Sequence, residues 1–462
     1  MAVPQTEIDR CGLSWAAKVI CSGVFVSGRN PTEVLRASCA WMAAPQEALR
    51  EALENRNPMA IMGLPFEVEV DEDRQAVRLS LNGVSGYARM HGDQGAIVCA
   101  EPDSEFHFET RDVPVRPAST ASPWEEALDD APRGIDEALD RAFANDFQFT
   151  NALLVLHRGR LIAERYRAPY DSRTRFEAWS MGKSIAASLV GVAQRKGLLE
   201  LDEPAGFDAW AGSGDPRAAI TIANLVNMAS GLSFTGSFGQ GEDHSVKAMD
   251  GKFLDHTYVY ASGVDSYRFC VGKPLADAPD TAGRYRNSDP LLATAAVRER
   301  ATGNDPRAFL TWPQTELFDR LGMTGMLLET DPWGHFLISG HDYGTARDWL
   351  RLGLLYLQRG AWGGEQLLEE SFVEFVQTPA AKAWSHDPYY GGFFCTNATG
   401  AIPTLPSDAF WMSGGGRQRV IVVPSMELVV VRFGHMAGLL FGLDETLQEV
   451  YGRIVSALGT DI

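Results

Sequence analysis

The stretch Ser180-Met181-Gly182-Lys183 decides how the rest of this 462-residue chain is interpreted. Apolar residues recur after it at helical spacing, at Ile185 and Leu189, which predicts a helix that begins at this motif. Residues three apart on a helix lie on one face, so the serine hydroxyl and the lysine amine are expected within reach of each other. A serine hydroxyl is a weak nucleophile until a base takes its proton, and a lysine of lowered pKa can be that base. The alternative is a surface helix with an ordinary lysine.

Two further short motifs could complete such a site. Tyr285-Arg286-Asn287 is the one Tyr-x-Asn of the chain, and a phenol beside a lysine and a serine can relay a proton to a leaving group. Met412-Ser413-Gly414-Gly415-Gly416 precedes the β-rich run 419–424, and small residues there let a substrate backbone approach an N–H group. Taken alone, the first motif is more often part of a loop and the glycines more often form a tight turn.

Together with these motifs, four other stretches make the chain resemble the β-lactamase-related serine hydrolases. That family includes class C β-lactamases, DD-peptidases, family VIII esterases and aminohexanoate-oligomer hydrolases. Residues 151–166 resemble its first core hairpin, and residues 220–232 resemble its segment ending in Ser-Gly-Leu. Residues 321–323 and 345–353 match two more landmarks, in the same order as in the family. The resemblance covers roughly residues 135–462.

The resemblance implies a role for each residue of the first two motifs. Ser180 would be the acylated nucleophile, and Lys183 would be its general base. Tyr285 would relay the proton to the leaving group, while Asn287 would orient the lysine or the substrate. The implied reaction is a two-step acyl transfer in which water finally releases the acyl group.

The third motif departs from the family pattern. β-Lactamases and DD-peptidases carry a Lys or His before Thr/Ser-Gly, and here Met412-Ser413-Gly414 stands in that place. In that family the cation binds a substrate carboxylate, so its absence here favours esters or small amides as substrates. Arg417 or Arg419 could supply a cation in its place. Ser413 and Gly414 remain candidates for substrate binding, and Gly415 would share the oxyanion with the N–H of Ser180.

These observations predict a serine hydrolase that cleaves a carboxylic ester or small amide. One alternative is a β-lactamase or DD-peptidase, for which turnover of nitrocefin or labelling by penicillin would be diagnostic. A second alternative is a non-catalytic relative that binds a ligand, which predicts no acylation at Ser180. The natural substrate and the oligomeric state stay open.

The composition restricts the classes of partner and cofactor that we expect for this protein. A net charge of −19 argues against nucleic acid, which needs basic patches, and no run approaches the roughly 20 apolar residues of a membrane helix. The nine histidines form no His-Glu-x-x-His and the six cysteines no Cys-x-x-Cys, so we expect no metal and no cofactor. Glu7 and Asp9 precede only a short apolar run, unlike a secretory signal. We therefore expect a cytoplasmic chain as given, or a periplasmic one if a signal was removed.

Breaks in composition divide the chain into three regions. Residues 1–111 form an accessory segment with a β-hairpin at 66–81, and residues 112–134 form a proline-rich linker. Residues 135–462 form the hydrolase domain, with a mostly helical lobe at about 198–340. Strands at both ends of that domain and terminal amphipathic helices predict an α/β (α+β) sandwich, in which helices flank one antiparallel sheet.

Overall fold

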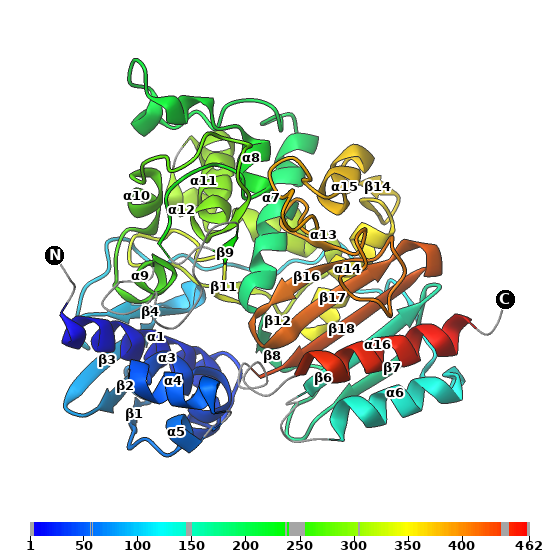
Figure 1. The fold of residues 1–462 in the computed structure, drawn as a ribbon, viewed down its shortest axis with the longest axis horizontal. Coiled ribbons are helices and arrows are strands. Elements are labelled where there is room, and N and C mark those ends of the chain that lie inside the picture. The colour runs from blue at the N-terminus through cyan, green and yellow to red at the C-terminus, as the bar shows by residue number, and fades with distance from the viewer. Residues whose placement is uncertain are drawn as a thin grey trace. The chain divides into compact units, whose positions relative to one another are not determined.

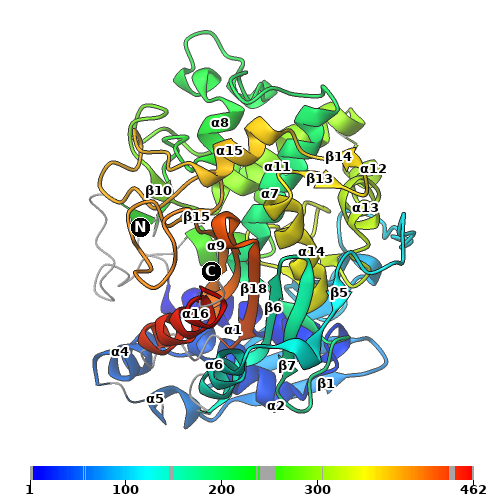
Figure 2. The same ribbon diagram turned by 90° about the vertical axis from the view of Figure 1, so that its right-hand side faces the viewer.

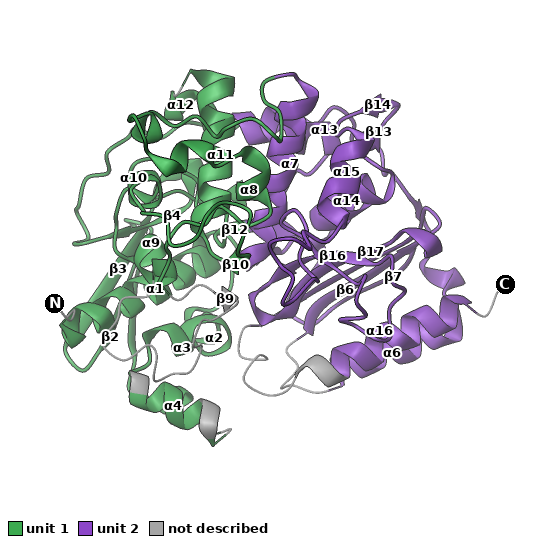
Figure 3. Ribbon diagram, turned by 45° about the horizontal axis from the view of Figure 1, so that its top comes forward, with its two compact units in different colours: residues 1–113, 198–311, 327–342 green, residues 114–197, 312–326, 343–462 purple. Residues whose placement is uncertain are grey.

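Apolar runs near residues 151–156 and 419–433 become the central strands of a seven-stranded sheet. The computed structural model describes residues 4–55, 57, 59–144, 150–235, 238–239, 255–303, 305–435 and 443–459. Its contacts divide the chain into two units, which Figure 3 shows in green and purple. Unit 1 comprises residues 1–113, 198–311 and 327–342, and unit 2 comprises residues 114–197, 312–326 and 343–462. Within the described residues, no helix is long and apolar enough to span a bilayer.

The sheet of unit 2 has the strand order β15-β16-β17-β18-β6-β7-β5. Its neighbours pair antiparallel except β5, which lies parallel to β7. The first and last strands of the hydrolase region meet at its centre, where Val430 of β18 lies opposite Val155 of β6. β6 and β18 are buried on both faces, so both read as continuous apolar runs rather than as alternating ones.

Helices cover both faces of this sheet. α6 and α16 lie side by side on one face, joined by a 2.7 Å ion pair between Arg141 and Glu449, as Figure 1 shows. α14 lies on the other face, which the turned view of Figure 2 makes clear. α14 approaches the sheet closely at Gly353, where an added Cβ would lie 2.6 Å from the Val420 side chain. The predicted sandwich of an antiparallel sheet flanked by helices is therefore confirmed.

The elements of unit 2 follow one another along three separate stretches of chain. In order, they are β5 (Glu125–Glu126), α6 (Arg133–Phe143), β6 (Thr150–His157), β7 (Arg160–Tyr166), β8 (Arg175–Glu177), α7 (Gly182–Arg195), α13 (Asp319–Leu321), β12 (Asp342–Thr345, which begins at the last residue of unit 1), α14 (Ala346–Leu357), β13 (Ala361–Trp362), β14 (Glu365–Gln366), α15 (Glu370–Gln377), β15 (Cys395–Thr396), β16 (Phe410–Gly414), β17 (Gln418–Val423), β18 (Leu428–Gly434) and α16 (Leu443–Gly459).

Unit 1 is built around α1 (Gln5–Phe25), which is buried from Cys11 to Gly23. This helix packs on a four-stranded antiparallel sheet in the order β1-β2-β3-β4, in which Val68 lies opposite Leu79. The contact is close because β3 carries a glycine there, since a Cβ on Gly86 would lie 2.1 Å from the backbone of α1. Contacts thus group the N-terminal 113 residues with residues 198–311 and 327–342.

A buried charge pair anchors α1 within unit 1. Lys18 and Glu329 are both fully buried, and their side chains form an ion pair of 2.6 Å. Lys18 also donates to the carbonyl of Ala96, and Ser22 donates to Glu329. Trp15 donates to Nε2 of the buried His341 at 3.0 Å. These bonds connect α1 to the start of β4 and to the segment that precedes β12.

The remaining elements of unit 1 are all shorter than α1. They are α2 (Pro31–Val34), α3 (Ala40–Ala43), α4 (Gln46–Glu54), α5 (Met59–Met62), β1 (Glu67–Asp71), β2 (Ala76–Leu81), β3 (Val84–Met90), β4 (Ala96–Cys99), α8 (Ile222–Val226), β9 (Phe238–Gly239), α9 (Asp255–Ala261), α10 (Ser266–Val271), β10 (Arg284–Tyr285), α11 (Ser288–Thr302), α12 (Pro306–Phe309) and β11 (Leu327–Leu328).

Candidate active site

Ser180 and Lys183 lie at the start of α7, as the sequence predicts. A 3₁₀ turn over Trp179–Met181 leads directly into the helix, so the two side chains are less than one turn apart. The Lys183 Nζ and the Ser180 Oγ are 3.0 Å apart and hydrogen-bonded. Lys183 is 1% exposed and Ser180 is half-buried, which leaves the hydroxyl accessible while its partner is enclosed. A proton can pass directly between these two atoms at this distance.

The backbone before Ser180 is strained. Trp179 has a φ of +53°, in the left-handed region that bulky side chains avoid, and its indole is buried. Such a conformation costs roughly 1–3 kcal/mol and persists only where its surroundings hold it. Trp179 therefore contributes to the shape of the turn that presents the hydroxyl.

The end of β16 packs against this turn. A Cβ on Gly414 would lie 2.1 Å from the carbonyl oxygen of Ala178, so no larger residue fits there without a shift of the backbone. The chain then reverses through Gly416, with a φ of +73°, and Arg417, with a φ of +60°. The third motif thus lies beside the turn that precedes the candidate nucleophile.

A buried arginine fixes the reversal after β16. Arg432 of β18 is fully buried and donates to the carbonyl of Gly416 at 2.6 Å and to that of Arg417 at 3.2 Å. Burial lowers the pKa of Arg432 to about 10, which leaves it protonated at neutral pH. Because its fork is rigid, it holds the turn that contains Gly415 in one conformation.

The alternation of side chains along β16 shows on which face of the sheet Arg419 lies. Met412 is fully buried opposite Val420, on the face that α14 covers. Ser413 lies opposite Arg419, on the face that α16 covers, because successive side chains alternate between faces. The Arg419 guanidinium lies 5.4 Å from the Trp411 ring centre, on that second face. Arg419 therefore points away from the position that the family's lysine would occupy.

Aromatic residues near the third motif contribute to the core. Phe410 is 1% exposed and packs on Phe394 and Tyr356, at ring-centre distances of 5.7 Å and 6.4 Å. Ser413 contributes a hydrogen bond to the buried Cys395, whose pKa is raised to about 12 chiefly by burial. Cys395 is therefore an unreactive core thiol.

Tyr285 and Asn287 belong to unit 1, where β10 leads into α11. The Tyr285 ring stacks on His256 with 6.5 Å between ring centres. Asn287 occupies the N-cap position of α11 but makes no side-chain cap bond. Its side chain is 3% exposed, and its Oδ1 has no hydrogen-bond partner among the described residues. A buried amide oxygen in that condition is costly, which makes Asn287 a candidate to accept a bond from a substrate or a catalytic group.

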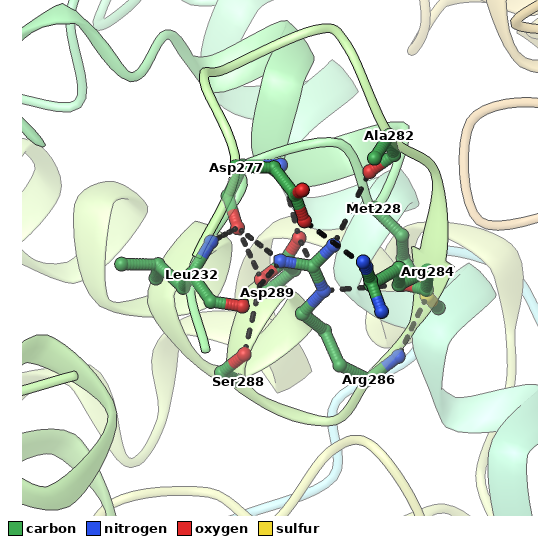
Figure 4. Close-up of polar contacts among 9 residues, drawn as sticks. Met228, Leu232, Asp277, Ala282, Arg284, Arg286, Ser288 and Asp289 are labelled. Carbon is green, nitrogen blue, oxygen red and sulfur yellow. Dashed lines mark hydrogen bonds and ion pairs between the residues drawn. The ribbon is translucent and has the colours of Figure 1, made fainter. Parts of the chain in front are cut away.

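Sequence reasoning missed the polar network that supports this second group. Asp289 accepts hydrogen bonds from Ser230 at 2.8 Å and from Ser288 at 3.0 Å, and Arg286 donates to the carbonyl of Leu232 at 2.6 Å. Figure 4 shows this network, in which Asp289 lies next to the buried guanidinium of Arg286. The sequence signal is the Ser-Gly-Leu at 230–232, which resembles a family landmark and gives no indication of its bonds to Asp289 and Arg286.

One group of side chains has the spacing of metal ligands within the described part of the chain. One ligand atom each of Asp265, Asp331 and His335 lies within 4.8 Å of the others. Asp331 accepts hydrogen bonds from the backbone N–H groups of Ser266 and His335, and Arg298 contacts the His335 ring nitrogen at 2.5 Å. The guanidinium disfavours a second cation there, and the carboxylate of Asp331 already braces its own loop.

Comparison with known proteins establishes the family. A family model described as beta-lactamase matches residues 139–438. No curated protein matches the chain. A Bacillus anthracis structure, provisionally assigned as a 6-aminohexanoate-dimer hydrolase, has a TM-score of 0.55 and 20% identity over 76% of this chain and 91% of its own.

Two other solved structures share the fold at similar distance. A family VIII carboxylesterase has a TM-score of 0.52 and 13% identity, over 69% of this chain and 96% of its own. A protein from Bacteroides dorei DSM 17855, provisionally assigned as a beta-lactamase, has a TM-score of 0.52 and 15% identity, over 69% and 98%. The resemblance found in the sequence is thus confirmed: the chain belongs to the beta-lactamase family.

Proposed function

We propose that this protein is a serine hydrolase that cleaves a carboxylic ester or small amide through an acyl-enzyme on Ser180. The observation that carries the proposal is the 3.0 Å hydrogen bond between the Ser180 Oγ and the buried Lys183 Nζ. An enclosed amine in contact with a half-buried hydroxyl is the arrangement that serine activation requires. The family match to hydrolases supports the reaction class.

The first half of the reaction forms the acyl-enzyme. Lys183 takes the proton of Ser180 as its Oγ attacks the substrate carbonyl carbon. Backbone N–H groups of Ser180 and Gly415 stabilise the oxyanion, an assignment supported by the close approach of Gly414 to the carbonyl of Ala178. Tyr285 delivers a proton to the departing alcohol or amine, so the bond to the leaving group breaks without releasing an anion.

The second half returns the enzyme to its starting state. The proton that Tyr285 delivers is replaced by the one that Lys183 took from Ser180, so both groups regain their starting states. Water then attacks the carbonyl carbon of the acyl group and gives a proton to Lys183. That proton passes to the Ser180 Oγ as the ester bond breaks and the carboxylic acid leaves. Asn287 orients Lys183 or the substrate during both halves. Its Oδ1 is buried and has no hydrogen-bond partner among the described residues. This oxygen can therefore accept a hydrogen bond from Lys183 or the substrate, which supports the role.

The substrate class follows from the third motif. Met412 is fully buried where related β-lactamases carry a cation, and Arg419 lies on the opposite face of the strand. Neither Met412 nor Arg419 offers a cation to a substrate carboxylate at the Met412 position, which leaves Arg417 as the candidate that could. These features favour esters and small amides over penicillins and peptide C-termini.

A β-lactamase or DD-peptidase activity is the second candidate, favoured by the family match alone. Turnover of nitrocefin, or labelling of Ser180 by penicillin at rates comparable to ester turnover, would promote it over the esterase. Failure of both, together with ester hydrolysis, would leave the first proposal in place.

The decisive experiment measures acylation of the intact protein. We would record its mass after a fluorophosphonate probe, and its turnover of p-nitrophenyl butyrate, for wild type, Ser180→Ala and Ser184→Ala. Ser184 is the matched control because it lies on the same helix and donates to the Phe393 carbonyl at 2.8 Å. We expect a stoichiometric adduct and turnover in wild type and Ser184→Ala, and neither in Ser180→Ala. An adduct that persists in Ser180→Ala, or no adduct in wild type, would favour a binding protein instead.

A further inference from the structure

A fully buried arginine separates the two candidate catalytic residues of unit 1. Arg286 stands between Tyr285 and Asn287 and is 0% exposed. Its guanidinium donates to three backbone carbonyls, those of Leu232 at 2.6 Å, Arg284 at 3.2 Å and Ala282 at 3.4 Å, as Figure 4 shows. One side chain therefore joins the loop after α8 to the strand that carries the phenol.

The charge of this arginine is balanced within the same network. Asp289 is fully buried, and its Oδ2 lies 3.9 Å from the Arg286 Nε. The Ser230 hydroxyl bonds both partners, donating to Asp289 at 2.8 Å and lying 3.3 Å from the Arg286 Nη1. Because a buried charge needs a partner and hydrogen bonds, the three side chains fold as one set.

The loop that faces Arg286 is shaped for this contact. Gly231 has a φ of +78°, and a Cβ there would lie 2.2 Å from the carbonyl of Asp277. The carbonyl of Gly231 accepts from the N–H groups of Ala276 and Asp277, at 2.8 Å and 3.1 Å. These bonds turn the carbonyl of the next residue, Leu232, toward the guanidinium.

We propose that Arg286 is a positioning residue that aligns Tyr285 and Asn287 for proton transfer, because it binds the backbone that precedes them and pairs with Asp289 in the helical turn that follows them. This inference rests on the proposed function and deepens it. The rigid, planar fork of an arginine can hold several carbonyls in fixed directions, whereas a lysine offers one flexible ammonium. Because Arg286 is the residue between Tyr285 and Asn287, holding its backbone in one conformation also limits the directions in which those two side chains extend.

A neighbouring ion pair provides the contrast. Arg284 and Asp277 are 3.1 Å apart, and their side chains are 20% and 26% exposed. This pair lies near Arg286, as Figure 4 shows, and joins Asp277 to the start of β10, but solvent reaches it. Partly exposed ion pairs contribute little to structure, so Arg284→Gln is a matched control for loss of a cation in this region.

The first experiment separates kcat from KM. With p-nitrophenyl butyrate as substrate, we expect Arg286→Met to lower kcat about 100-fold and to change KM less than about threefold, since misplacement near 1 Å can cost that much. Arg286→Lys should lose nearly as much, and Arg284→Gln should stay within about threefold of wild type. A wild-type kcat in Arg286→Lys would overturn the proposal, because a simple charge would then suffice.

A second pair of variants removes the effect of stability. Arg286→Met/Asp289→Asn replaces the charge pair by neutral side chains, so thermal unfolding should return toward that of wild type. We expect kcat to stay low in this variant even where its melting temperature is recovered. Recovery of kcat together with stability would overturn the proposal and leave Arg286 a structural residue.

A double-mutant cycle tests whether the effect acts through the phenol. In a Tyr285→Phe background, Arg286→Met should lower kcat far less than the roughly 100-fold expected in wild type, because one of the two groups that it positions is already absent. A further 100-fold loss in that background would contradict the proposal. Acylation of wild-type Ser180 is measured separately: its absence would remove the proposed function, whereas normal acylation with full kcat in Arg286→Met/Asp289→Asn would remove only this inference.

Discussion

Among the residues that the structure describes, Lys18 and Lys183 are almost completely buried, and they contact chemically different partners. Lys18, in α1 of unit 1, forms a 2.6 Å ion pair with Glu329 and donates to the carbonyl of Ala96. Lys183, in α7 of unit 2, is 1% exposed and bonds the Ser180 hydroxyl at 3.0 Å. The first contact joins an ammonium to a carboxylate and serves the fold. The second joins an amine to a group that can lose a proton.

The comparison shows that the partner of a buried lysine decides whether the lysine stabilises the fold or takes part in chemistry. Removing an ammonium from water is costly, and a carboxylate at ion-pair distance offsets that cost. At Lys18 the pair connects the N-terminal helix to the segment that follows β11, far along the chain, which fits a structural role. At Lys183 the contact with a hydroxyl is short and local, which fits a catalytic one. The predictions below test that contrast, from the largest effect to the smallest.

Replacing Lys183 should give the largest change in activity. We expect Lys183→Met to lower kcat/KM between about 100-fold and 10,000-fold, the range typical of a lost general base, with a normal melting temperature. Initial rates with a p-nitrophenyl ester and thermal unfolding of the same sample would measure both. If Lys183→Met instead lowered the melting temperature while each folded molecule kept the wild-type rate, Lys183 would be a structural residue, as Lys18 is.

Replacing Lys18 should give the opposite pattern. Lys18→Met leaves the carboxylate of Glu329 buried without its main partner, so we expect a loss of about 3–5 kcal/mol in the free energy of unfolding. Activity per folded molecule should change little. Lys18→Met/Glu329→Leu should recover much of the stability, because it removes both charges. Chemical denaturation of the three proteins checks this, and a stable Lys18→Met would show that the pair carries no weight.

The alignment of Ser180 with Lys183 should depend on Gly414. An added methyl group would lie 2.1 Å from the carbonyl of Ala178, so the turn before Ser180 must shift. We expect Gly414→Ala to slow labelling by a fluorophosphonate roughly 10-fold to 100-fold. Gly212→Ala is the control, since an added Cβ there meets nothing within 4 Å. Equal labelling rates in both variants would separate the third motif from the nucleophile.

The smallest expected effect is a pH dependence of stability near Lys18. Burial, and then the charge of Lys18, hold the pKa of His341 well below its usual 6.5. The unfolded chain therefore binds a proton below pH 6.5 that the folded chain does not, and stability falls as the pH falls. One such group contributes a slope of at most about 1.4 kcal/mol per pH unit.

Unfolding by urea between pH 5 and 7 would measure this slope. His341→Gln should lower stability at pH 7, because Trp15 loses the acceptor that it bonds at 3.0 Å, but its stability should depend less on pH. An equal slope in both proteins would assign the effect to other groups.

Much of the fold was predictable from local patterns. Alternation at residues 66–81 indicates the β1–β2 hairpin, and long apolar runs indicate the buried β6 and β18. The parallel pairing of the short β5 with β7 was not predictable, because its two residues, Glu125 and Glu126, are exposed and carry no apolar pattern. The position of α1 at the centre of unit 1 was also hidden, since many sites can accept an apolar helix.

The candidate site divides in the same way. The Ser-x-x-Lys spacing together with the family resemblance pointed to Ser180 and Lys183, and their contact follows from the helix. Asp289 looked like an ordinary acidic residue in a first helical turn, yet it is fully buried and bonded to Ser230. No local pattern could assign that partner, because the two residues are brought together only when separate segments pack.

What the sequence by itself determined about this protein is therefore the family, the sandwich of sheet and helices, and the pairing of Ser180 with Lys183. Each depends on geometry that repeats within a few residues, such as the helical turn that places positions three apart on one face. Only the tertiary structure decided that Lys18 meets Glu329 and that Ser230 meets Asp289. Those contacts depend on which distant segments pack together, and a buried charge is tolerated only where packing supplies its partner.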